Sequence, residues 1–203
     1  MARRQTRNDN LRLVLARESA RIMAEHGIDD FLLAKRKAAE RLGITERAAL
    51  PGNQEIESAL SEHLRLFAGQ AHENHLQKLR EVALGAMRNF NQFQPKLAGP
   101  VLNGTATPHS DITLHLFADP AELVAIRLMA LHVSYAIGER HIRFANRIEG
   151  YPVYVFEEDQ VQIEMTVFPD IMLRQAPKSP VDGKSMRRAG IAELQNLIEA
   201  CQA

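Results

Sequence analysis

The chain has 203 residues, 45% hydrophobic and 25% charged, which is the balance of a globular protein large enough to bury a substantial core. Lys and Arg together number 25, as do Asp and Glu, so the net charge is zero. That balance argues against a protein that coats nucleic acid through bulk electrostatics.

No apolar run approaches the ~20 residues of a membrane span, and the first ten residues, MARRQTRNDN, lack the apolar stretch of a secretory signal. The single cysteine, Cys201, cannot form an internal disulfide, which favours a reducing compartment. We therefore expect a cytoplasmic protein that does not associate with membranes.

Residues 1–95 show the 3.6-residue period of amphipathic helices throughout. Four helices are expected: from the cap-like Asn8–Asp9 to Gly27, from about Asp30 to Gly43, after Asn53, and from Ala71 to Phe93. Pro95 ends the last of them. The pattern predicts a helical bundle or arm with no strand before residue 96.

After Pro95 the period of the apolar residues changes from 3.6 to 2, the period of strands. Strand-like segments are Leu97–Leu102, Asp111–Phe117, Arg140–Ala145, Tyr151–Glu157 and Val161–Phe168. A helix opened by Asp119–Pro120 and ended by Gly138 separates the second from the third, and another helix follows a loop from Pro177 to Lys184.

This order predicts an α+β fold: an N-terminal helical region (residues 1–95), a small α/β domain with a mostly antiparallel mixed sheet (96–176), and a loop with a C-terminal helix (177–203). Alternation predicts which strand residues form the core. These are Ile112, Leu114, Leu116, Ile163, Met165 and Val167, which we expect beneath a helix face formed by Leu123, Ile126 and Ala130.

The segment LNGTATPHSDITLHLF, residues 102–117, holds the candidate functional residues. A strand is expected to end at Gly104–Thr105, where a glycine lets backbone amides approach a phosphate and a hydroxyl adds a donor. Ser110 and Asp111 open the next strand on its polar face, and Glu164 is the carboxylate on the corresponding face of a later strand. Asp111 and Glu164 are therefore candidate catalytic and Mg²⁺-binding residues, while Gly104, Thr105 and Ser110 are candidate cofactor-binding residues.

Each residue also has a purely structural interpretation. Gly104 after Asn103 is an ordinary tight-turn signal, and Asp111 can cap the turn with its side chain. Glu164 can lie on a solvated face or pair with an arginine such as Arg143. The strand period also places His109, Asp111 and His115 on one face, a spacing that a transition-metal site could use.

The same segment resembles the signature of the polymerase-β-type nucleotidyltransferases: a Gly-Ser pair, a turn, Asp-x-Asp in a hydrophobic strand, and a third carboxylate on a later strand. Gly104 and Thr105 match the first pair, Asp111 the first carboxylate and Glu164 the third. The resemblance covers residues 96–170 and implies carboxylates that hold two divalent metals. Thr113 stands where the family has its second carboxylate, and the turn before Asp111 is shorter than usual.

The resemblance implies a nucleotidyltransferase-like protein that binds a nucleotide weakly with Mg²⁺ and has little or no transfer activity. An active Mg²⁺-dependent nucleotidyltransferase that uses an NTP is one alternative. The other is a non-catalytic module for interaction or dimerisation. A nucleotide is the expected ligand, and an RNA, a protein partner or a second copy of the chain remain open as partners.

Overall fold

The computed structural model describes residues 2–45, 49–144 and 147–201. The chain divides into two compact units. Unit 1 contains Met1–Glu73, Thr105–Ser110 and Pro180–Asp182, and unit 2 contains Asn74–Gly104, Asp111–Ser179 and Gly183–Ala203. The expected class is confirmed, because helices come first and a mixed five-stranded sheet follows.

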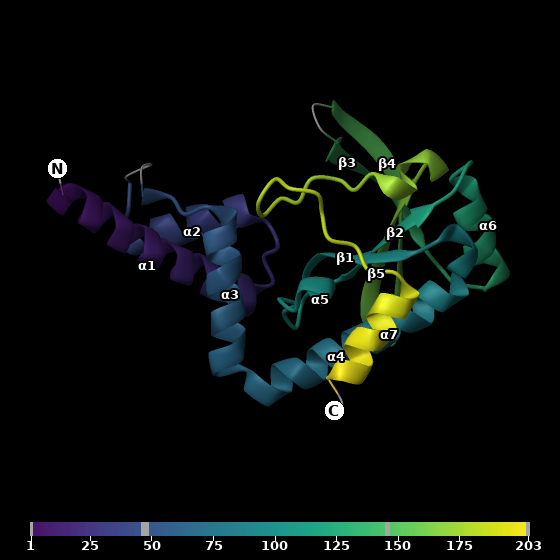
Figure 1. The fold of residues 1–203 in the computed structure, drawn as a ribbon, viewed down its shortest axis with the longest axis horizontal. Coiled ribbons are helices and arrows are strands. Elements are labelled where there is room, and N and C mark those ends of the chain that lie inside the picture. The colour runs from purple at the N-terminus through teal and green to yellow at the C-terminus, as the bar shows by residue number, and fades with distance from the viewer. Residues whose placement is uncertain (1, 46–48, 145–146, 202–203) are drawn as a thin grey trace. The chain divides into compact units, whose positions relative to one another are not determined.

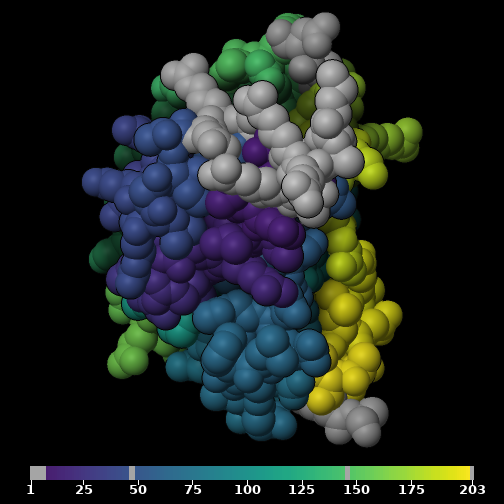
Figure 2. Space-filling model, turned by 90° about the vertical axis from the view of Figure 1, so that its left-hand side faces the viewer, coloured from purple at the N-terminus to yellow at the C-terminus, as the bar shows by residue number. Residues whose placement is uncertain are grey.

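Unit 1 is built from α1 (Ala2–His26), α2 (Phe31–Leu42) and α3 (Asn53–Phe67). The Asp30 carboxylate accepts hydrogen bonds from the backbone N–H groups of Leu32 and Leu33 and so begins α2. Gly43 ends α2 in the left-handed conformation (φ 64°). One apolar cluster joins the three helices; it consists of Ala16, Ala20, Met23, Ala34, Ile56, Leu60 and Leu64. Figure 2 shows α1 and α2 lying against each other on the surface of this unit.

The start expected for α1 is wrong, because Asn8–Asp9 lies inside the helix and does not cap it. The preceding residues, ARRQTR, include Ala, Arg and Gln, which favour helix, and contain no Gly or Pro to stop it.

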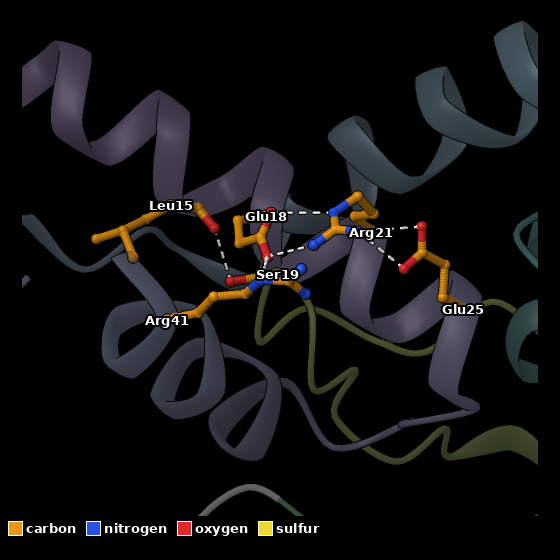
Figure 3. A network of polar contacts seen from close by, with 6 residues as sticks. All are labelled: Leu15, Glu18, Ser19, Arg21, Glu25 and Arg41. Carbon is orange, nitrogen blue, oxygen red and sulfur yellow. Dashed lines mark hydrogen bonds and ion pairs between the residues drawn. The ribbon is translucent and has the colours of Figure 1, made fainter. Parts of the chain in front are cut away.

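A network of side-chain ion pairs links α1 to α2 (Figure 3). Glu18 accepts two hydrogen bonds from Arg21, at 2.7 and 3.0 Å, and lies 3.4 Å from Nε of Arg41 on α2. Arg21 also binds Glu25 at 2.9 Å. The hydrogen bonds from Arg21 lower the pKa of the Glu18 carboxyl, and partial burial raises it. The hydrogen bonds have the larger effect, so the pKa of Glu18 lies below its usual value.

Unit 2 centres on a sheet of order β1-β2-β5-β4-β3 (Figure 1). The strands are β1 (Lys96–Ala98), β2 (Ile112–Phe117), β3 (Ala136–Phe144), β4 (Arg147–Glu158) and β5 (Val161–Phe168). The pair β2–β5 is parallel and the other three pairs are antiparallel, so the mostly antiparallel mixed sheet is confirmed. Within the described residues every strand follows residue 95, as the change of period predicted.

The remaining elements of unit 2 are helical. They are α4 (Gly69–Asn89, in this unit from Asn74 onward), the short 3₁₀ helices η2 (Asn91–Phe93) and η3 (Asp170–Arg174), α5 (Gly99–Asn103), α6 (Glu122–Ala130) and α7 (Ile191–Ala200). Figure 1 shows α4 and α7 side by side, and an Nη1 of Arg80 on α4 lies 3.6 Å from the Cys201 sulfur after α7. The described helices include none that is both long and apolar enough to cross a membrane.

The sheet has one apolar face. Its strand residues are the six predicted core residues, each at most 1% exposed: Ile112, Leu114, Leu116, Ile163, Met165 and Val167. Phe156 shares this face through its register with Ile163, and its ring lies 6.3 Å from that of Phe90, which follows α4. The predicted core strands are therefore confirmed.

The helix face predicted over that core is wrong. Leu123 and Ile126 of α6 are 41% and 58% exposed, and the buried residues of α6 are Val124, Ala125 and Leu128. The segment ELVAIRLMA is apolar on nearly every side, so its period does not identify the face that packs.

Two element boundaries also differ from expectation. The strand expected at Leu97–Leu102 stops at Ala98, because α5 begins at Gly99, which adopts a positive φ (73°), and Pro100 lies in its first turn. The helix expected to reach Gly138 ends at Ala130, where His132 (φ 56°) reverses the chain, and Ala136 begins β3. Val133 and Ile137 fit either a helix or a strand pattern, so the sequence did not separate the two.

Candidate functional site

Thr113 and Glu164 lie on the face of the sheet opposite the apolar core, and Asp111 directly precedes β2. We call this the polar face; its polar residues on β2 and β5 are Thr113, His115, Gln162, Glu164 and Thr166, and Phe117 and Phe168 form its aromatic end. Thr113 and Glu164 are direct register partners on the parallel pair β2–β5, and His115 and Thr166 are the next pair on that face. The Asp111 carboxylate, one residue before β2, accepts a hydrogen bond from Nε2 of Gln162 at 2.9 Å. Residues that are distant in sequence thus come together on two neighbouring strands.

The Glu164 carboxylate is bound by an arginine. Nη2 of Arg140, on the edge strand β3, lies 2.6 Å from Oε2 of Glu164, and the two side chains are 43% and 18% exposed. From the sequence, Arg143 was the arginine suggested as an ion-pair partner of Glu164. Arg143 is three residues along β3, and strand alternation places it on the opposite face.

Two carboxylates near this face, Asp111 and Glu164, were the candidates to hold Mg²⁺. Asp111 and Glu164 supply two carboxylates, but each already accepts a hydrogen bond from Gln162 or Arg140. Thr113 offers a neutral hydroxyl where a second ion would need a bridging carboxylate. Nowhere among the described residues do three or more His, Cys, Asp or Glu side chains gather in a way that could hold a metal.

Gly104 ends α5 and does not end a strand, contrary to expectation. It has φ 82°, and its N–H binds the Pro100 carbonyl, so it closes a helical turn. A Cβ at Gly104 would lie 3.8 Å from Leu76 of α4. The glycine is therefore explained by its backbone conformation, and not by crowding.

Thr105 and Ser110 belong to unit 1, whereas Gly104 and Asp111 belong to unit 2. The turn between them is held by its own side chains: Oγ of Ser110 accepts a hydrogen bond from the N–H of Thr107 at 2.9 Å and lies 3.2 Å from the Thr107 hydroxyl. Thr105 is 7% exposed and Ser110 6%. The Ser110 hydroxyl thus has a structural task in the turn.

A glycine that the sequence analysis did not single out lies beside Thr113. Ala98 is the β1 register partner of Thr113, and Gly99 follows it with φ 73°. A Cβ built on Gly99 would be 3.5 Å from Oγ1 of Thr113, an ordinary contact. Next to Thr113, the polar face therefore meets a stretch of backbone that carries no side chain. The Gly99–Pro100 dipeptide, a common turn signal, is what in the sequence could have drawn attention to it.

Two residues of the polar face and one neighbouring arginine carry buried polar atoms without a hydrogen-bond partner among the described residues: Nδ1 of His115, Oγ1 of Thr166 and Nη1 of Arg188. His115 is 3% exposed and Thr166 fully buried. Burial, reinforced by the positive charges of Arg188 and Arg140, lowers the pKa of His115 to about 3. His115 is thus neutral near pH 7.

Arg188 lies over the aromatic end of the same face. Its guanidinium carbon is 5.5 Å from the centre of the Phe117 ring, and Nη2 donates to the Leu173 carbonyl at 3.0 Å. Phe117 belongs to a cluster with Phe144, Tyr151 and Phe168 against which Met172 and Leu173 of η3 pack. Burial lowers the pKa of Arg188 from its ordinary value.

The interpretation of His109, Asp111 and His115 as a metal site finds no support in these positions. His109 is exposed and belongs to unit 1, whereas His115 is buried in unit 2 with its ring 4.9 Å from that of Phe168. A two-residue period describes these residues only where the chain is a strand, and β2 begins at Ile112.

Comparison with known proteins adds no relative: no family model matches the chain, and neither a curated protein nor a solved structure matches it.

Proposed function

We propose that the polar face of the sheet binds a nucleotide weakly, with one Mg²⁺, and transfers a nucleotidyl group slowly or not at all. The observation that carries the proposal is the register pairing of Thr113 and Glu164 on one face of two adjacent parallel strands, with Asp111, one residue before β2, hydrogen-bonded to Gln162 of β5. The order of β1, α5, β2 and a later carboxylate strand beside β2 also agrees with the resemblance drawn from the sequence.

In this proposal Asp111 and Glu164 hold the ion, and phosphate oxygens and water complete its shell. The ion would neutralise phosphate charge. Arg140 competes for Glu164, because its guanidinium already forms a charge-assisted hydrogen bond with that carboxylate. Binding of Mg²⁺ therefore has to displace Arg140 or share the carboxylate with it, which supports weak affinity.

Slow transfer follows from the residue at position 113. In a two-metal displacement, a carboxylate bridges the ions that align the nucleophile and the leaving group. Thr113 brings no charge to the position opposite Glu164. With a single ion, the chain can orient phosphates but lacks the second stabiliser of developing charge.

Isothermal titration calorimetry tests the proposal directly. ATP should bind the wild-type chain measurably in the presence of Mg²⁺ and at least about tenfold more weakly in EDTA, a difference of about 1.4 kcal/mol. Asp111→Asn and Glu164→Gln should each reduce the Mg²⁺-dependent part. The matched control is Glu157→Gln, an exposed carboxylate of β4. Equal binding with and without Mg²⁺, or no binding, contradicts the proposal.

A role as a dimerisation platform is the second candidate, and the edge of the sheet favours it. In the described part of the sheet β3 has a neighbour on one side only, and seven of its nine residues are exposed. Ile137 of β3 and Ile148 of β4 are 66% and 62% exposed. An open edge strand with exposed apolar side chains can pair with another chain. Light scattering after size-exclusion chromatography, compared with an Ile137→Lys variant, tests this candidate.

A further inference from the structure

The buried end of the polar face contains more hydrogen-bonding groups than the protein satisfies. His115 and Thr166 are register partners on β2 and β5, and Arg188 lies over Phe117, two residues along β2 from His115. Each of the three side chains has a buried polar atom without a partner, among all the residues that the structure describes. A buried polar atom left unsatisfied costs about 1–3 kcal/mol, so three in one place indicate a missing binding partner.

The charge of this cluster determines the kind of partner. Arg188 is a permanent cation, and none of the ion pairs between described residues includes it. Arg140, whose charge also acts on His115, is paired with Glu164. The cluster therefore has an unbalanced positive charge and contains no carboxylate that could attract a metal cation.

The hydrogen-bonding capacity of the three groups also favours an anion as the partner. Nη1 of Arg188 can only donate, and the Thr166 hydroxyl is able to donate. A neutral histidine donates from Nδ1 in one of its two tautomers. An oxygen-rich anion can accept hydrogen bonds from all three groups and supplies the missing negative charge. A water molecule can satisfy two to four such groups but leaves the charge of Arg188 unbalanced.

We propose that His115, Thr166 and Arg188 form a phosphate-binding subsite that needs no metal ion and takes a phosphate group, either free or part of a nucleotide. Arg188 is the least buried of the three residues. Its contacts to the Leu173 carbonyl and the Phe117 ring hold the guanidinium in place. The inference builds on the proposed function, since both use the polar face, but it assigns a different set of residues.

Titration with inorganic phosphate in EDTA, at constant ionic strength, separates this subsite from the Mg²⁺ site. The readouts are calorimetry and the ¹⁵N resonance of the His115 ring nitrogen Nδ1. Wild-type protein should bind phosphate saturably and shift that resonance. Arg188→Gln should weaken binding by about tenfold or more, as the loss of a charge-assisted hydrogen bond predicts. Thr166→Val, which keeps the shape of the side chain, should weaken it about threefold or more.

Arg187→Gln is the matched control, because the neighbouring Arg187 is exposed and pairs with Glu193. It should leave phosphate binding within about twofold, which is under 0.5 kcal/mol. Circular dichroism checks that each variant is folded, and the wild-type resonance shift provides a test that requires no variant. A second titration uses AMP in EDTA. The tighter-binding ligand of the two, AMP or inorganic phosphate, shows whether the subsite takes a nucleotide phosphate or free phosphate.

The outcomes separate this inference from the proposed function. If phosphate binds and depends on Arg188 while Mg²⁺-ATP does not bind, the subsite stands and the proposed function fails. If Mg²⁺-ATP binds but phosphate causes no saturable shift of the His115 ¹⁵N resonance, the proposed phosphate subsite is wrong. The three polar atoms then bind ordered water only. Equal phosphate binding by the Arg187 and Arg188 variants also overturns it.

Discussion

Thr113 of β2 and Glu164 of β5 are direct register partners on the polar face, so a side chain at position 113 extends beside the Glu164 carboxylate. Thr113→Asp should therefore place a second carboxylate next to Glu164 and tighten Mg²⁺ binding by about tenfold, or 1.4 kcal/mol. Thr113→Asn is the control, with nearly the same shape and no charge. Calorimetric titration with Mg²⁺ measures the effect, and equal affinities of the wild type and the two variants contradict an eroded two-metal site.

The Arg140–Glu164 pair gives a second prediction. Arg140→Gln removes the cation that binds the Glu164 carboxylate at 2.6 Å. Mg²⁺ affinity should then rise, because the ion no longer competes with a guanidinium. The change in stability should be small, at most about 1 kcal/mol, since the arginine is 43% exposed. Arg143→Gln, on the same strand but the opposite face, should leave Mg²⁺ affinity unaltered. A fall in affinity in Arg140→Gln would mean that the arginine takes part in binding.

Two glycines with the same backbone conformation should differ in their tolerance of a methyl group. Gly27 and Gly43 have φ 63° and 64°, so Ala at either position costs about 1 kcal/mol for strain. A Cβ at Gly27 would also lie 2.7 Å from Cβ of His109, whereas Gly43 has open space. Gly27→Ala should be the more destabilising by at least about 1 kcal/mol. Urea unfolding of both variants measures the difference, and equal losses would show that the turn containing His109 does not pack tightly.

The buried strand β2 gives a prediction for the core. Leu114 is fully buried on the apolar face, in register with Leu97 and Met165. Leu114→Ala should lower the free energy of unfolding by about 2–5 kcal/mol, through lost burial and the cavity that remains. Thr113→Ala, one residue away and partly exposed, serves as the control and should cost much less. A loss below about 1 kcal/mol in urea unfolding of Leu114→Ala contradicts the assignment of the faces.

Period and composition predicted the helical first half, the strand order along the chain and the apolar residues of β2 and β5, because these depend on local pattern. They did not predict which side of α6 packs, since Leu123 and Val124 are equally apolar. Nor did they predict the division of the segment 104–111 between two units, which depends on contacts distant in sequence. Local pattern fixes a residue's face on its own strand, whereas the covering of that face depends on the rest of the chain.

His115 illustrates that limit. Alternation placed it on the polar face beside Asp111, but Phe168 and the aromatic cluster around it bury the ring. Neither Phe168 nor Arg188 is near His115 in sequence. The pKa of about 3 therefore could not be predicted from the residues around position 115.

The lowered pKa of His115 predicts acid sensitivity. Burial is its main cause, and the charges of Arg188 and Arg140 add to it; Lys96 is the register partner on β1. The folded chain keeps His115 neutral down to about pH 3, whereas the unfolded chain protonates it below its ordinary value of 6.5. Above pH 6.5 both states are neutral and no stability is lost. As the pH falls from 6.5 toward 3, the unfolded state binds the extra proton and is favoured.

Between pH 8 and pH 5 this single group should lower the free energy of unfolding by about 2 kcal/mol. Urea unfolding of the wild type and of His115→Gln at a series of pH values measures the effect. The variant should be less stable at pH 8, because Gln fits the site poorly, but its stability should fall less toward pH 5. Carboxylates such as Glu18, whose lowered pKa matters only at more acid pH, cancel in the comparison. Parallel pH profiles for the two proteins would mean that His115 titrates normally and that the polar face is open to water around it.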